Sequence, residues 1–360
     1  MNLSEYPQGE TTQTADPNLS VCPDTSSPSS NDVDFIFPKS TANWDPRVVD
    51  RLRVRHVEED IFCIVNSKWC LFHLSSADQR MIERCVEACD LKLDYESLDV
   101  IAPNIVTPLR TWVNSWRPNE EQLKIIRTEE LLKKFETRLD EFSYCLASIV
   151  AQRKPNTTLS ESKYQTLFKK LLRLFDFYTW SQPFLETEKA MILGKTVSST
   201  ADILCCLSDP GIEKPVVCMC DIRDACSKVD ESVLQPRKRP RCHSGDSSST
   251  VTTSSGKCSL SPHIGELFVY LDQSVRNEGI LGITVERTLV RITYLHIEKS
   301  SMEQIKLGNS TGSIELDELN RPVFYYSKPL NFMKQNDRRV LFKALLFMKL
   351  MQLKYEKGSA

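Results

Sequence analysis

Two aspartates and an arginine stand at the ends of two neighbouring apolar segments. Asp202 opens the segment 201–207, Ala-Asp-Ile-Leu-Cys-Cys-Leu, whereas Asp221 and Arg223 close the segment 216–223, Val-Val-Cys-Met-Cys-Asp-Ile-Arg. Nearly continuous apolar runs of this length, bounded by Gly and Pro, predict strands that are covered on both faces. Residues two apart on a strand leave the same face, so Asp221 and Arg223 place a carboxylate and a cation at one edge of a sheet.

Adjacent strands would bring the two aspartates together. Asp202 and Asp221 then supply hard oxygen ligands of the kind that Mg²⁺ prefers. The pair could therefore hold Mg²⁺ or Mn²⁺. In the alternative interpretation, Asp202 is a strand-end acid that faces solvent, and Asp221 forms an ion pair with Arg223 or Arg237.

This arrangement resembles the PD-(D/E)XK, or restriction-endonuclease-like, nuclease superfamily. The core pattern of that family is an acid that opens one strand and an acid-x-Lys that closes the next. Asp202 matches the first acid and Asp221 the second, while Arg223 stands where the family has lysine. Residues 264–275 have apolar side chains at helical spacing and are similar to the helix that follows this strand in the family. Glu266, in that segment, stands where the family often has Gln.

The resemblance extends upstream to the helix that usually begins this fold. Apolar residues at helical spacing from Tyr164 to Phe175 predict that helix. Glu161 lies in its first turn, where the family often has a third catalytic acid. Thr158-x-x-Glu161 is also a capping box, which would fix the start of the helix without any chemistry, and the two roles are compatible.

The fold class that the resemblance implies is α/β (α+β), with a mixed central sheet flanked by helices and a restriction-endonuclease-like core. Residues 280–297 are similar to the two strands that close the core sheet in this family. The expected organisation has four parts: a disordered tail at 1–40, a mainly helical scaffold domain at 41–155, a nuclease-like domain at 156–357, and within it a disordered basic and Ser-rich insertion at 226–260.

The expected scaffold domain contains no recognisable chemical motif. Residues 60–72 could form a short hairpin or a buried helix, because periodicity alone does not decide. One helix is expected to run to about Cys89, capped within Ser75-Ser76-Ala77-Asp78, and another is expected to be opened by residues 118–121 and to run to about Leu146, with a break near Thr128. A last apolar helix is expected at about 336–355.

A dense basic cluster lies in the insertion. Arg237, Lys238, Arg239 and Arg241 surround Pro240. This composition predicts either an address read by a nuclear import receptor or a phosphate-binding arm. We therefore expect a nuclear protein; the alternative is a solvated charge run in a cytoplasmic protein.

Composition limits the remaining classes. The 360 residues are 41% hydrophobic and 26% charged, with a formal net charge of −2, which excludes a uniformly basic nucleic-acid coat but not a local basic patch. The 13 cysteines include no C-x-x-C pair and are expected to be small core residues in a reducing compartment. The sequence shows neither a secretory signal nor an apolar run of membrane-spanning length, so we expect no membrane partner.

The predicted function is a nuclease-like protein that binds DNA or RNA and whose metal-dependent phosphodiesterase site is degenerate. Arginine holds a phosphate but stays protonated, so Arg223 cannot take a proton from water. Asp221 is also one methylene shorter than the more frequent glutamate. Two alternatives remain: an inactive scaffold module that uses the fold for protein binding, and an active Mg²⁺-dependent nuclease with a relocated lysine, namely Lys195, Lys214 or Lys228.

Overall fold

A computed structural model describes most of the chain after the first 34 residues. The described ranges are 35–69, 73–98, 101, 118–153, 159–207, 215–223, 260–308, 314 and 316–358. Nearly all of the predicted tail and insertion, including the basic cluster at 237–241, lies outside them. From Phe37 onward the chain forms one compact unit.

The core of this unit is a mixed sheet with the strand order β1-β9-β8-β7-β6-β5-β2, in which β10 also pairs with β8. Its strands are β1 (Arg55–Glu58), β2 (Tyr178–Ser181), β5 (Ile203–Cys206), β6 (Val216–Arg223), β7 (Gly279–Glu286), β8 (Leu289–His296), β9 (Val323–Tyr326) and β10 (Leu330–Asn331). Two pairs, β1 with β9 and β6 with β7, are parallel, and the other pairs are antiparallel. The predicted mixed central sheet is confirmed.

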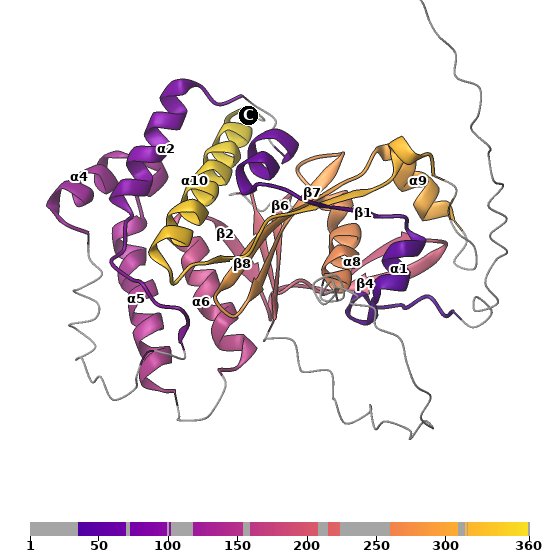
Figure 1. Ribbon diagram of the computed structural model, residues 1–360, viewed down its shortest axis with the longest axis horizontal. Helices are drawn as coiled ribbons and strands as arrows, with labels where there is room; N and C mark the ends of the chain where they lie inside the picture. The colour runs from indigo at the N-terminus through magenta and orange to yellow at the C-terminus, as the bar shows by residue number, and fades with distance from the viewer. Residues whose placement is uncertain are drawn as a thin grey trace, which may run out of the picture. The chain divides into compact units, whose positions relative to one another are not determined.

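Helices cover both faces of the sheet (Figure 1). Those described are α1 (Pro46–Arg51), α2 (Ser76–Ala88), α4 (Glu120–Thr128), α5 (Phe135–Ala151), α6 (Glu161–Leu174), α8 (Ser261–Tyr270), α9 (Lys299–Leu307) and α10 (Gln335–Gly358). Figure 1 shows α5, α6 and α10 on one side of the sheet, and α8 and α1 on the other. The sheet is therefore buried on both faces, as the apolar strands predict.

The side chains of β6 point alternately to the two faces of the sheet. Seven of its eight residues are buried. Cys218, Cys220 and Ile222 share one large apolar cluster with residues of α5, α6 and α10. Asp221 has the opposite parity along the strand and lies near His263 of α8. Covered apolar strands thus position a carboxylate against a buried helix.

The N-terminal segment forms several of the predicted helices. Ser75 caps α2 in a capping box with Asp78, and the helical segment that follows α4 begins anew after Thr128. Residues 63–69 are helical, so this part of the segment 60–72 forms a helix and not a hairpin. Buried residues on both sides of position 155 share one apolar cluster.

Two further strands, β3 (Glu188–Ile192) and β4 (Lys195–Ser199), form a separate antiparallel hairpin. Gly194 has a φ of +66° in its turn, a backbone conformation that glycine adopts at little cost. Among the described residues, no helix combines the length and apolarity needed to cross a membrane.

Candidate functional site

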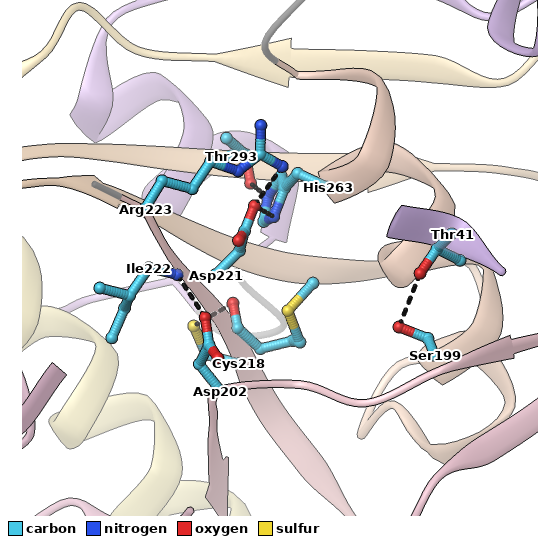
Figure 2. A network of polar contacts seen from close by, with 10 residues as sticks. Thr41, Ser199, Asp202, Cys218, Asp221, Ile222, Arg223, His263 and Thr293 are labelled. Carbon is cyan, nitrogen blue, oxygen red and sulfur yellow. Dashed lines mark hydrogen bonds and ion pairs between the residues drawn. The ribbon is translucent and has the colours of Figure 1, made fainter. Parts of the chain in front are cut away.

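Asp202 and Asp221 lie on facing positions of β5 and β6. Ile203 pairs with Cys220 in this antiparallel ladder, so Asp202, one residue before β5, lies opposite Asp221. Asp202 Oδ2 accepts a hydrogen bond of 2.7 Å from the backbone N–H of Ile222 (Figure 2). The two acids that the sequence analysis selected are thus brought together by strand register and by one hydrogen bond.

The partly buried position of Asp202 changes its acidity. Burial raises the pKa of Asp202 to about 6, although the hydrogen bond from Ile222 lowers it and the negative charges of Asp221 and Glu161 raise it further. A substantial fraction of Asp202 is therefore protonated at mildly acidic pH. Asp202 therefore lies within the electrostatic reach of both Asp221 and Glu161.

Arg223 forms an ion pair with Asp221 on the same face of β6. Arg223 Nη2 lies 2.5 Å from Asp221 Oδ2, and the Asp221 side chain is 8% exposed (Figure 2). Burial lowers the pKa of Arg223, but the charge and hydrogen bond of Asp221 outweigh this effect and leave the pKa raised. The ion pair that the sequence analysis kept as an alternative is therefore present. The other partner considered there, Arg237, lies outside the described residues.

Glu161 is the first residue of α6, and Ser160 is its N-cap. Glu161 thus does not occupy the third helical position that a capping box requires, and Thr158 lies outside the described residues. The side chain is exposed, and its charge acts on Asp202. One turn further along α6, Gln165 Nε2 donates a hydrogen bond of 3.1 Å to the carbonyl oxygen of Asp202. This contact ties the helix to the acidic cluster.

His263 of α8 is a buried site residue that the sequence analysis missed. It is 0% exposed, and its Nε2 lies 2.8 Å from Thr293 Oγ1 on β8. Its Nδ1 lies 3.6 Å from Asp221 Oδ2. Burial lowers the pKa of His263 to about 4, so the imidazole is neutral at neutral pH.

A glycine on β7 provides the space for this histidine. A Cβ added at Gly282 would lie 2.7 Å from His263 Nε2 and would also collide with Thr293 Oγ1. A residue with a side chain at position 282 would fill the space in which His263 and Thr293 meet, so this contact requires glycine there.

Glu266 completes the buried polar group, one helical turn after His263. Burial raises the pKa of Glu266 well above its ordinary value, and the charge of Asp221 raises it further. Ligand atoms of Asp221, His263 and Glu266 all lie within 4.8 Å of one another. The i, i+3 spacing of His263 and Glu266 on the predicted helix was a signal for this pair in the sequence.

The predicted Mg²⁺ or Mn²⁺ site at Asp202 and Asp221 fits the structure only in its ligand type. Both side chains offer oxygen, but the Arg223 cation already pairs with Asp221 Oδ2. A cation at this oxygen has to displace the guanidinium or bear its repulsion. The two aspartates alone therefore do not form a free two-carboxylate site.

A basic groove of about 600 Å³ runs along the edge strand β2 and α6. Five cations and one carboxylate line it: Lys134, Arg138, Lys169, Arg173, Lys349 and Asp176. Aromatic side chains of residues 177–184 also line the groove, and Tyr178 and Phe184 are 39% and 70% exposed. The groove thus combines an excess of positive charge with exposed aromatic surface.

One stripe of α6 connects the groove to the acidic cluster. Arg173, Lys169, Gln165 and Glu161 are spaced four residues apart, so they lie on one face of the helix. Lys169 Nζ donates a hydrogen bond of 2.5 Å to Ser181 Oγ, and Ser181 pairs with Ile203, the residue after Asp202. The groove and the aspartates therefore belong to one continuous region.

Comparison with known proteins identifies no relative: no protein-family model matches the chain, and no curated protein matches it.

Proposed function

We propose that this protein binds nucleic acid through a restriction-endonuclease-like core whose metal-dependent phosphodiesterase site is degenerate. The order of elements supports this proposal. Helix α6 is followed by β2, by the separate β3–β4 hairpin, by the antiparallel strands β5 and β6, then by α8, and then by β7, which is parallel to β6. The resemblance implies the order of α6, β5, β6, α8 and the β7–β8 hairpin, whereas β2 and the β3–β4 hairpin are additional elements.

The observation that carries the proposal is the ion pair between Arg223 and Asp221, opposite Asp202. A lysine in this position would present a compact point charge, whereas the guanidinium is a planar fork that stays protonated at neutral pH. Arg223 can hold an anion such as a phosphate, but it cannot accept a proton from an attacking water. It also neutralises Asp221, the carboxylate that a catalytic cation needs most. Binding is therefore retained and hydrolysis is impaired.

The groove beside β2 supplies the binding surface. Lys and Arg side chains neutralise backbone phosphates, and exposed aromatic rings stack on bases that are not paired. Of the five cations in the groove, Lys134 and Arg138 pair with Asp176, and Lys349 is 3% exposed. Lys169 and Arg173 are therefore left for a phosphate, beside the exposed rings of Tyr178 and Phe184. A single strand of DNA or RNA can use both the cations and the rings.

A lysine relocated from another element would restore activity, and Lys195 is the one described candidate. It lies on the exposed side of the β3–β4 hairpin rather than on the central sheet. Lys214 and Lys228 lie outside the described residues. The position of Lys195 outside the central sheet thus favours binding over catalysis.

Binding is tested by fluorescence anisotropy in EDTA with labelled single-stranded DNA, double-stranded DNA and single-stranded RNA. We expect the whole chain to bind a single strand with a salt-dependent affinity. The double variant Lys169→Glu and Arg173→Glu should weaken binding at least tenfold and reduce the salt slope, because it reverses two charges of the groove.

The matched control is the double variant Arg80→Glu and Arg339→Glu, which reverses two exposed charges outside the groove. Thermal melting followed by circular dichroism shows that each variant is folded. Absence of binding at low salt, or equal loss in both double variants, contradicts the proposed function.

A further inference from the structure

One ring nitrogen of His263, Nδ1, is buried without a hydrogen bond to any described residue. The residue is 0% exposed, and its Nδ1 has no hydrogen-bond partner among the described residues. The nearest charged oxygen, Asp221 Oδ2, is 3.6 Å away, which is too far for a hydrogen bond. Buried polar atoms without partners are rare in folded proteins and indicate an unseen water or ion.

Glu266, one helical turn further along α8, carries a second such atom. Its Oε2 is buried and lacks a hydrogen-bond partner within the part of the chain that the structure describes. Asp221, His263 and Glu266 form a group in which one ligand atom of each residue lies within 4.8 Å of the other two. Two ligands of one tetrahedral cation with bonds of about 2.0–2.1 Å lie roughly 3.4 Å apart, close to the separation of His263 Nδ1 and Asp221 Oδ2.

The opposite edge of the imidazole is held as in a metal-bound histidine. His263 Nε2 contacts Thr293 Oγ1 at 2.8 Å, and this contact fixes the orientation of the ring. When Nε2 donates to the hydroxyl, the lone pair of Nδ1 points at Asp221 and Glu266. Metal-binding histidines are oriented in this way by a hydrogen bond from the second ring nitrogen.

We propose that Asp221, His263 and Glu266 form a binding site for one divalent first-row transition ion of the zinc class. The imidazole nitrogen favours Zn²⁺ or a neighbouring transition ion over Mg²⁺, which prefers oxygen ligands. Glu266 has to release its proton to solvent when the ion binds; Asp221 and Glu266 then supply two negative charges that match a divalent cation, and a water fills the open fourth position. The site shares Asp221 with the pair of aspartates, but it uses His263 and Glu266 in place of Asp202.

Arg223 regulates access to this site. In the structure its guanidinium pairs with Asp221 Oδ2, and its side chain is 28% exposed. The arginine can therefore leave toward solvent when a cation takes its place on Asp221. The proposal does not depend on nucleic-acid binding.

The test measures binding of the metal alone to the whole chain. The protein is stripped with EDTA, dialysed, and titrated with Zn²⁺, Mn²⁺ or Mg²⁺ by isothermal calorimetry in a reducing buffer. We expect one Zn²⁺ site that Mg²⁺ does not compete for, and at least a tenfold loss of affinity in His263→Gln and in Glu266→Gln. The control His73→Gln, at an exposed position, should bind as the wild type does.

A second measurement covers the case in which a substitution in the buried cluster prevents folding. Nitrogen-detected NMR of the wild-type chain follows the five histidines during the titration. Zn²⁺ should shift Nδ1 of His263 in the same concentration range in which calorimetry detects binding. Absence of this shift, or Zn²⁺ binding that both variants retain, would overturn the proposed site. Neither outcome affects the anisotropy measurements in EDTA, so this proposal and the proposed function fail separately.

Discussion

Arg223 Nη2 lies 2.5 Å from Asp221 Oδ2, and the same oxygen lies 3.6 Å from His263 Nδ1. One carboxylate oxygen is thus close to both a cationic guanidinium and a neutral imidazole. In the proposed metal site, the guanidinium and the metal ion would compete for this oxygen, because both need its negative charge.

Arg223→Gln should therefore raise the affinity for Zn²⁺ about tenfold or more, because it removes a positive charge a few ångströms from the ion. In EDTA the same variant should be less stable than the wild type by about 2–3 kcal/mol, since it leaves Asp221 buried without a partner. Calorimetry and urea denaturation measure the two effects. Arg339→Gln, at an exposed position on α10, serves as the control. An unchanged affinity would show that the guanidinium does not compete with the ion.

Asp202 should make the stability depend on pH in EDTA. Its pKa is raised from 3.8 to about 6 in the folded protein, so the folded state binds this proton more tightly than the unfolded state. The free energy of unfolding should therefore fall as pH rises through about 4 to 6, by at most about 3 kcal/mol from this group. Asp202→Asn keeps the side chain neutral and should be the more stable protein at pH 7. Urea denaturation at pH 4 and pH 7 tests this; an identical pH dependence in both proteins would contradict it.

Arg338 should be a main source of stability outside the site. Its guanidinium is buried and donates to the carbonyl oxygens of Phe332, Met333, Leu91 and Leu93, the last at 2.7 Å. Arg338→Met would leave these carbonyls without their donor, at a cost of about 3–5 kcal/mol. Arg339→Met, the exposed neighbour, should change the stability by less than about 0.5 kcal/mol. Equal denaturation midpoints for the two variants would show that the buried contacts contribute little.

The nuclear location remains a prediction from the sequence. Replacing Arg237, Lys238, Arg239 and Arg241 with alanine should move a fluorescent fusion of the chain from the nucleus to the cytoplasm, because the import receptor recognises the positive charge. Quantitative imaging of the nuclear fraction measures this. If the variant fusion stays in the nucleus, the basic cluster is not the import signal.

The sequence predicted the parts of the fold that depend on local patterns. The strand of residues 216–223, the helix of α6 and the hairpin of β7 and β8 all have strong apolar periodicity, and each is present. The short edge strands β1 and β2 were missed because four polar or mixed residues carry no clear alternation. Their formation depends on pairing with β9 and β5, which are distant in the sequence.

The site residues likewise include some that local patterns predicted and others that depend on distant contacts. Asp202 and Asp221 were found because they stand at strand ends next to apolar runs. His263 was missed because its role depends on contacts with Asp221 and Thr293, 42 and 30 positions away, and on the missing side chain of Gly282. No pattern within α8 reveals those contacts.

Single-turnover cleavage tests the central claim, a nucleic-acid site with impaired catalysis, most directly. Excess protein is incubated with labelled single- and double-stranded DNA and RNA in Mg²⁺ or Mn²⁺, beside Asp202→Ala and Asp221→Ala. The substrates should be bound, and cleavage by the wild type should stay at the level of the two variants. Robust cleavage that both substitutions abolish would rule out impaired catalysis, because it would show that Arg223 leaves the phosphodiesterase site intact.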